Sequence, residues 1–241
     1  MSKYQVIILA AGKGTRLKPI TRRIPKTLVK VKNKPLIKII LNSLNKKFTT
    51  EILIIVGYKY DKIKKLVGEK FKGIPVKYLF NPLFYKTNST YSMWLASPLI
   101  QNNVIIINAD TIFDKKILQF LIKSKYPNAL SVDDNIKTPL PAEAMKVTLM
   151  KNKIIDVSKK IKKDKTHGDA IGIYKFDKLG VKNLKKNLDS LIYKNNIKNL
   201  FTLAVKNMLK KLDIHYVSTM KKKWIEIDNI QDLKDAKKMF K

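Results

Sequence analysis

Short apolar runs rich in β-branched residues alternate with amphipathic stretches through the first half of this 241-residue chain. The apolar runs predict strands at 5–9, 52–56, 76–80 and 104–108. The amphipathic stretches predict helices at 35–44, 62–70, 91–97 and 115–122. Strands that are apolar along their whole length and separated by helices form a parallel sheet that is covered on both faces. This alternation confines the first half to an α/β arrangement.

The second half predicts shorter and partly antiparallel strands. These strands are expected at 129–132, 145–150, 154–157, 170–176, 214–218 and 224–227, with a hairpin turn at 151–153. Helices are expected at 178–188 and 200–210, and a closing helix near Asn229. We therefore predict an α/β fold, a Rossmann-like three-layer α/β/α arrangement with a mostly parallel mixed sheet and a smaller, partly antiparallel region. No Gly/Ser-rich linker interrupts the chain, so we expect a single domain over 1–241 with two halves that meet near residue 113.

The net charge of +33 suggests a nucleic-acid or membrane surface, but the kind of cation argues against it. Only Arg16, Arg22 and Arg23 of the 51 basic residues are arginine, and arginine is the residue that reads phosphates and bases with a bidentate fork. We therefore expect no nucleic-acid partner, although a non-catalytic polyanion-binding protein stays an alternative. The apolar runs are strand-sized and no signal pattern opens the chain, so we expect a soluble cytoplasmic protein without a membrane partner. The absence of cysteine excludes thiolate metal sites.

A glycine-rich segment follows the first predicted strand. The sequence Leu-Ala-Ala-Gly-Lys-Gly-Thr-Arg ends at Arg16, and Lys26 follows ten residues later. Small residues after a strand let backbone N–H groups close around phosphates, and the two cations would add charge for a triphosphate. A lone Gly-Lys-Gly is otherwise an ordinary turn. The segment is neither a Walker A loop nor a G-x-G-x-x-G fingerprint.

The longer run A-A-G-K-G-T-R-L-K-P-I-T-x-x-x-P-K resembles the signature of the sugar-phosphate nucleotidyltransferase superfamily. Segments 81–96, 108–110, 157–159 and 224–229 resemble its phosphocholine cytidylyltransferase branch. The resemblance implies transfer of CMP from CTP to a small phosphorylated amino alcohol, with Mg²⁺ as cofactor and pyrophosphate as product. It also implies a nucleotide-binding half at about 1–113 and an acceptor-binding half at about 114–241. UTP or dTTP in place of CTP, and a sugar 1-phosphate as acceptor, stay open.

The resemblance assigns roles to individual residues of the nucleotide site. Arg16 and Lys26 match its catalytic cations. The residues that match its nucleotide-binding positions are Ala10, Ala11, Gly12, Gly14, Thr15, Asn88 and Ser92. Side-chain amides and hydroxyls such as those of Asn88 and Ser92 are suited to a pyrimidine edge.

Two carboxylates match the magnesium ligands of the family. Asp110 directly follows an apolar strand, where an ionised carboxylate needs a cation. A helix cap explains Asp114 better than Asp110, because Asp114 directly precedes a predicted helix. Asp228 could be a metal ligand or the cap of the closing helix. The metal role is favoured because Glu226 and Asp228 are expected on the same face of one strand.

The acceptor site is the least constrained part. Lys159 matches a position for the acceptor phosphate, although it also lies in a lysine-rich stretch typical of a solvated loop. Glu143 and Glu226 are our candidates for the rest of the acceptor site, and Glu143 could bind an acceptor ammonium or be a surface acid. A choline group would need an aromatic cage. The candidates for that cage are Tyr85, Tyr174, Tyr193 and Trp224.

Overall fold

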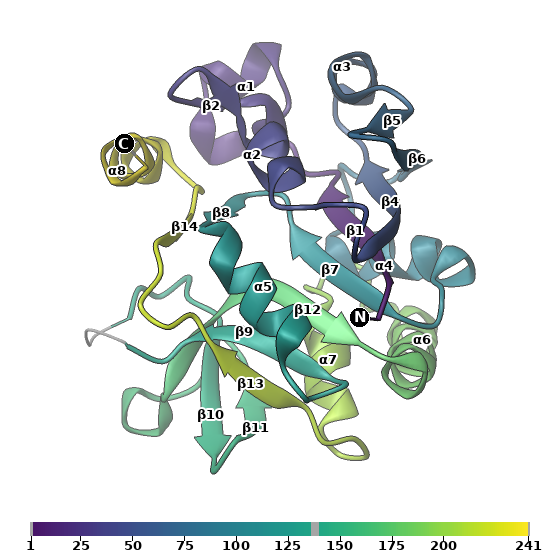
Figure 1. Ribbon diagram of the computed structural model, residues 1–241, viewed down its shortest axis with the longest axis vertical. Coiled ribbons are helices and arrows are strands. Elements are labelled where there is room, and N and C mark those ends of the chain that lie inside the picture. The colour runs from purple at the N-terminus through teal and green to yellow at the C-terminus, as the bar shows by residue number, and fades with distance from the viewer. Residues whose placement is uncertain (1, 136–139, 241) are drawn as a thin grey trace.

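The computed structural model describes residues 2–135 and 140–240, and a ten-stranded mixed sheet runs through them (Figure 1). The strand order is β10-β11-β13-β9-β12-β7-β1-β4-β6-β5. The bounds are β1 (Tyr4–Ala10), β4 (Thr49–Val56), β5 (Lys70–Phe71), β6 (Ile74–Phe80), β7 (Val104–Asn108), β9 (Ala129–Asp133), β10 (Lys146–Met150), β11 (Lys153–Val157), β12 (Gly168–Phe176) and β13 (His215–Ser218). Two small ladders pair β2 (Lys30–Val31) with β3 (Lys34–Pro35), and β8 (Thr111–Phe113) with β14 (Trp224–Glu226).

Helices cover both faces of the sheet. They are α1 (Ile20–Arg23), α2 (Leu36–Asn42), α3 (Tyr60–Val67), α4 (Ser89–Ala96), α5 (Lys115–Lys123), α6 (Lys178–Tyr193), α7 (Thr202–Met208) and α8 (Ile230–Met239). Strands β7, β1, β4 and β6 run parallel, and β12 joins them as the antiparallel neighbour of β7. One sheet therefore contains strands from both halves of the chain, as the three-layer prediction requires.

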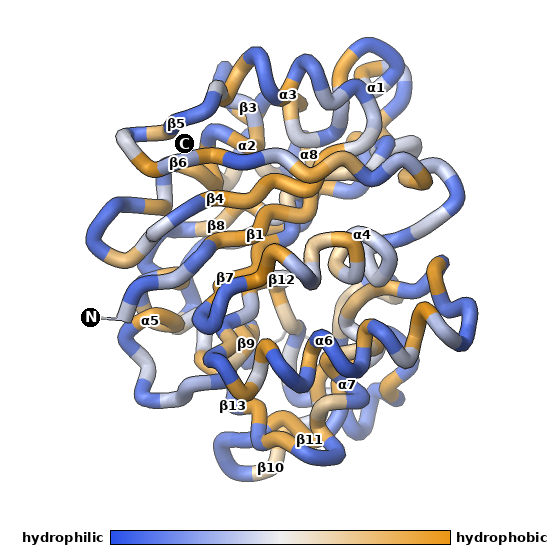
Figure 2. Tube along the Cα trace, turned by 90° about the vertical axis from the view of Figure 1, so that its right-hand side faces the viewer, coloured by the Kyte–Doolittle hydropathy of each residue, from blue (hydrophilic) through white to orange (hydrophobic). Residues whose placement is uncertain are grey.

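Alternate residues of the central strands serve two separate hydrophobic cores. Val6 and Ile8 of β1 pack with the buried residues of α2, α3 and α5, whereas Ile7 packs with those of α4, α6 and α7. All three side chains are fully buried. Figure 2 shows the central strands as a hydrophobic band inside the molecule. Successive side chains of a strand point to opposite faces, so uninterrupted apolar runs are what a two-sided sheet requires.

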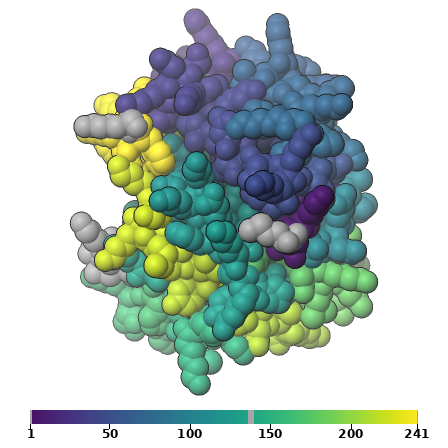
Figure 3. Space-filling model, in the orientation of Figure 1, coloured from purple at the N-terminus to yellow at the C-terminus, as the bar shows by residue number. Residues whose placement is uncertain are grey.

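A third, smaller core holds the C-terminal end against the N-terminal part. Leu233 and Ala236 of α8 pack with Ile112 of β8 and with Val29 and Val31 of the N-terminal segment. In Figure 3 the C-terminal residues accordingly lie beside the N-terminal ones on the face shown. This packing brings β14 and the residues after it next to the end of β7.

The predicted elements are present, most with bounds shifted by one to three residues. The hairpin between β10 and β11 has a two-residue loop, because Met150 pairs with Lys153, and Lys151 takes a left-handed φ of 54°. The first long helix of the second half continues to Tyr193, five residues beyond the prediction. The short strands β2, β3, β5 and β8 and the helix α1 were not predicted, because two- to four-residue elements carry too little periodicity to be recognised.

None of the helices in residues 2–135 and 140–240 has the length and apolarity that a membrane crossing requires.

Candidate active site at the ends of the parallel strands

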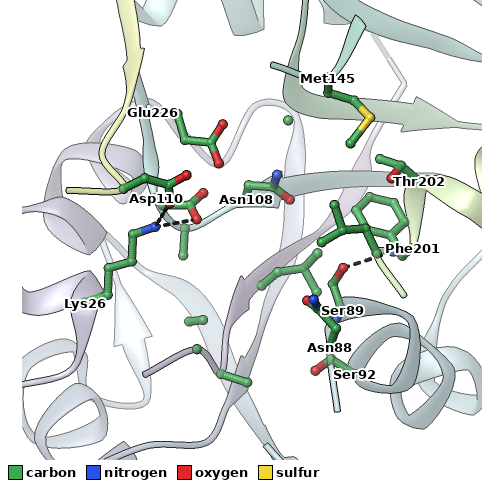
Figure 4. A pocket seen from close by; sticks show the side chains of 18 of the residues that line it. Lys26, Asn88, Ser89, Ser92, Asn108, Asp110, Met145, Phe201, Thr202 and Glu226 are labelled. Carbon is green, nitrogen blue, oxygen red and sulfur yellow. Dashed lines mark hydrogen bonds and ion pairs between the residues drawn. The ribbon is translucent and has the colours of Figure 1, made fainter. Parts of the chain in front are cut away.

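A cavity of about 410 Å³ lies where the parallel strands β1, β6 and β7 end (Figure 4). Residues 9–12 lie at the end of β1, Asn81 follows β6, and residues 108–110 lie at the end of β7. The wall from the second half of the chain includes Glu143, Met145, Lys159, Gly172, Glu226 and Asp228. The carboxyl ends of parallel strands are the usual ligand-binding edge of α/β sheets. The fold therefore brings both halves of the chain together at the edge where a ligand is expected.

The glycine-rich segment after β1 turns sharply at Gly14, whose φ is +64°. A 3-10 turn at Thr15–Leu17 follows, and Thr21 donates a hydrogen bond from Oγ1 to the carbonyl oxygen of Gly14 at 2.8 Å. A Cβ atom on Gly14 would lie 2.7 Å from Cβ of Lys26. Glycine is therefore needed here both for the backbone conformation and for the close approach of Lys26.

The predicted nucleotide-binding residues of this segment divide into two groups. Ala10, Ala11 and Gly12 line the cavity, whereas Gly14 and Thr15 are not among the lining residues. The structure thus offers the main chain of residues 10–12 to a ligand. Gly14 and Thr15 shape the turn that carries Arg16.

Lys26 lies between the two carboxylates that we assigned to the metal. Its Nζ donates to Oδ2 of Asp110 at 2.9 Å and to Oδ1 of Asp228 at 2.7 Å. Its side chain is only 11% exposed. Burial alone would lower the pKa of Lys26, but the charges of the two carboxylates and their hydrogen bonds outweigh burial and raise it. Lys26 is therefore a fixed cation.

Arg16 and Lys159 extend this ion-pair network across the mouth of the cavity. Arg16 contacts Asp228 at 2.7 Å and Glu143 at 3.8 Å, and Lys159 contacts Glu143 at 2.8 Å. The hydrogen bond and the charge of Lys159 lower the pKa of Glu143, and Arg16 adds to this effect. The carboxylate of Glu143 is thus already partnered by two cations, which argues against the ammonium-binding role we considered for it.

Three carboxylates converge in a way that suits a divalent cation. Oxygen atoms of Asp110, Glu226 and Asp228 lie within 4.8 Å of one another. Oδ1 of Asp110 is buried and accepts no hydrogen bond from any described residue. Burial, followed by the charges of Asp110 and Asp228, raises the pKa of Glu226 to about 8. Oxygen ligands with an unsatisfied buried lone pair fit Mg²⁺, so these residues could hold the expected cofactor.

Asp228 reaches this cluster by a different route from the one we predicted. Strand β14 ends at Glu226, so Asp228 lies two residues beyond the strand rather than on it. The backbone N–H of Ile227 donates to the carbonyl oxygen of Asp110 at 3.0 Å, which holds the two segments together. The cap of α8 is Asn229, in a capping box with Asp232. The alternative that Asp228 caps the closing helix is therefore wrong.

Asn88, directly before α4, and Ser92, on α4, lie at the other side of the cavity (Figure 4). The side chain of Asn88 caps α4 by accepting from the backbone N–H of Ser89 at 2.8 Å. Oγ of Ser92 accepts from Nδ2 of Asn81 at 3.0 Å. Both predicted residues therefore line the same cavity as the ion-pair network.

Comparison with known proteins identifies the family of this chain. The family model described as nucleotidyl transferase matches residues 5–241. The chain belongs to the nucleotidyl transferase family.

The names of curated relatives of this nucleotidyl transferase indicate several different substrates. The chain is 36% identical to D-glycero-alpha-D-manno-heptose 1-phosphate guanylyltransferase of Campylobacter jejuni over 46% of the chain and 49% of that protein. It is 36% identical to choline-phosphate cytidylyltransferase of Streptococcus pneumoniae over 51% and 52%. It is 30% identical to CTP:phosphoglutamine cytidylyltransferase of C. jejuni over 70% and 72%. The chain thus spans about half the length of the first two relatives.

Solved structures show the same fold over the whole chain. The inositol-1-phosphate CTP transferase from T. maritima superposes with a TM-score of 0.82 at 21% identity, covering 100% of this chain and 96% of that one. The CTP:phosphocholine cytidylyltransferase from S. pneumoniae superposes with a TM-score of 0.79 at 25% identity, covering 99% and 100%. The predicted α/β class and the Rossmann-like three-layer arrangement are confirmed.

Several lining residues of this nucleotidyl transferase site were not predicted. Asn108 projects into the cavity in Figure 4, and it fits because Gly172 opposite has a φ of +81° and no Cβ. A Cβ there would lie 2.7 Å from Nδ2 of Asn108. Met145, Phe201 and Thr202 also line the cavity. The polar residue Asn108 at the end of an apolar strand was a usable signal, whereas nothing local marked the other four.

The proposed aromatic cage does not form among the described residues. Tyr174 lines the cavity, but Tyr85, Tyr193 and Trp224 are not among the lining residues. Tyr193 is 93% exposed. The indole N–H of Trp224 donates to Asp133 at 2.7 Å. Of the four proposed cage residues the cavity therefore contains only Tyr174, and its other aromatic lining residues are Phe84 and Phe201.

Asp169, which is buried in β12 near the acceptor side, gives a prediction for stability against pH. Burial raises its pKa to about 7, although a hydrogen bond from the Met145 backbone lowers it. Because the folded pKa lies above the unfolded value of 3.8, Asp169 makes its full contribution to the free energy of unfolding below about pH 4. That contribution is lost as the pH rises through 7. We expect Asp169→Asn to raise the free energy of unfolding by about 4 kcal/mol at pH 8 and to have almost no effect at pH 4.

Urea unfolding of both proteins at the two pH values measures this difference. The exposed residue Asp164 gives the matched control Asp164→Asn, which should change stability little at either pH. An equal gain for Asp169→Asn at both pH values would show that the carboxylate is not protonated in the folded chain.

Proposed function

We propose that this chain transfers CMP from CTP to a small phosphorylated amino alcohol or a similar phosphocholine-like acceptor, and releases pyrophosphate. The observation that carries the proposal is the ion-pair network of three cations and their carboxylate partners, which lies in the cavity at the ends of the parallel strands. Arg16, Lys26 and Lys159 are the cations, and Asp110 and Asp228 are the carboxylates that would be shared with a metal. The family membership and the two cytidylyltransferase relatives support CTP as the donor.

The chemistry needs little from the protein beyond positioning and charge. An oxygen of the acceptor's phosphate attacks the α-phosphorus of CTP in line, and the bond from that phosphorus to the pyrophosphate oxygen breaks. A phosphate oxygen is already ionised at neutral pH, so no general base is required. Positioning of the two reactants and neutralisation of the phosphate charge account for the rate of such a transfer.

Each cation of the network has a place in this scheme. The backbone of residues 10–12 and Arg16 would hold the β- and γ-phosphates, Lys26 would neutralise the α-phosphate, and Lys159 would orient the acceptor's phosphate. Asp110 and Asp228 would hold Mg²⁺, which supplies charge neutralisation at the reacting phosphates. In the structure the cations are paired with carboxylates instead, so substrate phosphates would replace Glu143 and Asp228 as partners of Lys159 and Arg16.

The two halves of the chain contribute different parts of this site. We infer that the chain works as one unit, with residues 1–113 as the nucleotide half and 114–241 as the acceptor half. The shared sheet and the common cavity support this inference, because each half alone supplies only one of the metal-binding carboxylates Asp110 and Asp228.

A sugar-1-phosphate nucleotidyltransferase is the second candidate function. The relative named as a heptose 1-phosphate guanylyltransferase is as similar to this chain, at 36%, as the choline-phosphate cytidylyltransferase is. The failure of the four tyrosine and tryptophan candidates to gather around the cavity also removes one argument for choline itself. The acceptor class therefore needs a direct measurement.

Pyrophosphate release with Mg²⁺ tests the proposal. CTP, UTP, dTTP, ATP and GTP are each paired with phosphocholine, phosphoethanolamine, aminoethylphosphonate, glycerol phosphate, inositol phosphate and glucose 1-phosphate. We expect release with CTP and an amino-alcohol phosphate. Release with a sugar 1-phosphate alone would establish the second candidate. Release with GTP or ATP but not with CTP would contradict the assignment of the donor.

A further inference from the structure

Asn81, the residue directly after β6, is held in one orientation. Its side-chain Oδ1 accepts from the backbone N–H of Leu83 at 2.9 Å. A backbone N–H can only donate, so the amide oxygen must face Leu83 and the amide nitrogen must face the other way. Asn81 is 1% exposed, and its own backbone N–H donates to Val56 at 2.8 Å. The orientation of this amide is therefore fixed by the main chain.

The amide nitrogen of Asn81 donates to two hydroxyl groups. Nδ2 lies 3.0 Å from Oγ of Ser92 and 3.2 Å from Oγ1 of Thr87. The hydroxyl of Thr87 donates in turn to the carbonyl oxygen of Leu83 at 2.8 Å, so its proton is already used. No described residue accepts a hydrogen bond from the hydroxyl of Ser92. Asn81 occupies one of the two lone pairs of this oxygen, and the proton is the donor that a partner in the cavity can still accept.

Ser92 is placed rigidly on the side of the cavity away from the ion-pair network. It is 5% exposed and lines the cavity from α4. The start of α4 is held to a later loop by hydrogen bonds from Asn88 N to Ile197 O and from Thr90 N to Asn199 O. In Figure 4, Ser92 and Asn88 lie on one side of the cavity, and Lys26 and Asp110 lie on the other. A nucleotide whose phosphates meet the cations would extend its base toward α4.

We propose that Asn81 fixes the Ser92 hydroxyl as a hydrogen-bond donor to ring nitrogen N3 of cytosine, and that this pair selects CTP over UTP and dTTP. The inference rests on the proposed function and deepens it. N3 of cytosine carries a lone pair and accepts a hydrogen bond, whereas N3 of uracil and thymine carries a hydrogen. Cytosine N3 therefore pairs the hydroxyl proton, whereas the N3–H of uracil or thymine can meet only the remaining lone pair of the oxygen and leaves the buried hydroxyl proton without an acceptor.

Two variants, one at Ser92 and one at Asn81, separate the effect of the direction of the hydrogen bond from the effect of side-chain packing. Ser92→Ala removes the hydroxyl, and we expect the preference for CTP over UTP to fall roughly tenfold. Asn81→Asp puts a second acceptor oxygen where Nδ2 was, while its other oxygen can still accept from Leu83. The Ser92 hydroxyl would then donate to this new carboxylate oxygen and present a lone pair to the base. We expect this variant to shift the preference further toward UTP than Ser92→Ala does.

The measurement is the dissociation constant of CTP and of UTP by isothermal titration calorimetry with Mg²⁺ and without acceptor. The ratio of kcat/KM for the two nucleotides is measured alongside it. Thr87→Val is the matched control, because it removes the second partner of Nδ2 and leaves the contact with Ser92 in place. Its ratio should stay that of the wild type. Ser92→Ala removes a single oxygen, so it keeps the test decisive if Asn81→Asp fails to fold.

The outcomes distinguish this inference from the proposed function. A wild-type protein that binds neither CTP nor UTP, but binds GTP or ATP, would contradict the proposed function before any variant is made. A wild type that prefers CTP, with the same ratio in Ser92→Ala and Asn81→Asp, would overturn only the role of Asn81 and Ser92. A higher ratio for CTP in either variant would also overturn it, because the hydroxyl would then favour uracil.

Discussion

Replacing Asp110 with Asn is expected to lower the rate of pyrophosphate release about a thousandfold while leaving the fold intact. Asparagine keeps the size of the side chain but removes its charge. Lys26 keeps Asp228 as its second partner, so the interior does not acquire an unpaired cation. The loss would fall on the reaction, because Asp110 is one of the three converging carboxylates and its buried Oδ1 has no hydrogen-bond partner among residues 2–135 and 140–240. The initial rate with CTP and the best acceptor, together with thermal unfolding, measures both effects.

Asp114 supplies the matched control, four residues further along the chain. Its side chain caps α5 by accepting from the backbone N–H of Lys116 at 2.8 Å. Asp114→Asn keeps a good capping residue, so both activity and stability should stay close to those of the wild type. Near-native activity of Asp110→Asn would refute the assignment of Asp110 to the reaction centre. An equal loss of activity in both variants would point to a general effect of removing acids from this segment.

Replacing Lys26 with Met is expected to lower the free energy of unfolding by about 3–5 kcal/mol and to abolish most activity. The buried ammonium bridges Asp110 and Asp228, and Glu226 lies close to both. Without it three carboxylates would face one another, and in the part of the chain that the structure describes Arg16, at Asp228, would be their remaining ion-pair partner. Removing one partner of a buried ion pair lowers the free energy of unfolding by more than the intact pair contributes to it, because the other charge is left buried and uncompensated.

The response to added Mg²⁺ tests whether the carboxylates around Lys26 form a cation site. The cation can neutralise the carboxylates that Lys26 leaves behind, so the melting temperature of Lys26→Met should rise with millimolar Mg²⁺ more than that of the wild type does. Lys30→Met, at an exposed position of β2, is the control and should show neither the loss nor the recovery. If the melting temperature of Lys26→Met does not change with Mg²⁺, the carboxylates do not form a cation site.

The regular elements of the fold could be predicted because their signals are local. The runs of β1, β4 and β7 are apolar at nearly every position, and these positions are buried on one face of the sheet or the other. Asp114 and Asn229 precede helices and cap them, since a side-chain oxygen beside free backbone N–H groups is a short-range interaction. Such signals depend only on neighbours along the chain.

The acceptor side could not be predicted to the same extent, because its contacts join residues far apart in sequence. Glu143 was a candidate for an acceptor ammonium, yet Lys159 and Arg16 neutralise it in the folded chain. Whether an acid is free or paired depends on which cations the fold brings close to it, and this chain has 51 of them to choose from. The unpredicted pair of Asn108 and Gly172 likewise depends on the antiparallel register of β12 beside β7.

The sequence by itself determined the layered α/β architecture, the turn that needs Gly14, and the kinds of group available to bind phosphates and a metal. These follow from periodicity, backbone sterics and side-chain chemistry, which act over a few residues. Tertiary structure alone decided that Asp228 lies beyond β14 beside Asp110, that Lys26 bridges the two, and that Asn81 orients Ser92. Those relations depend on where separate segments meet, and that is decided by the packing of the whole sheet and its helices.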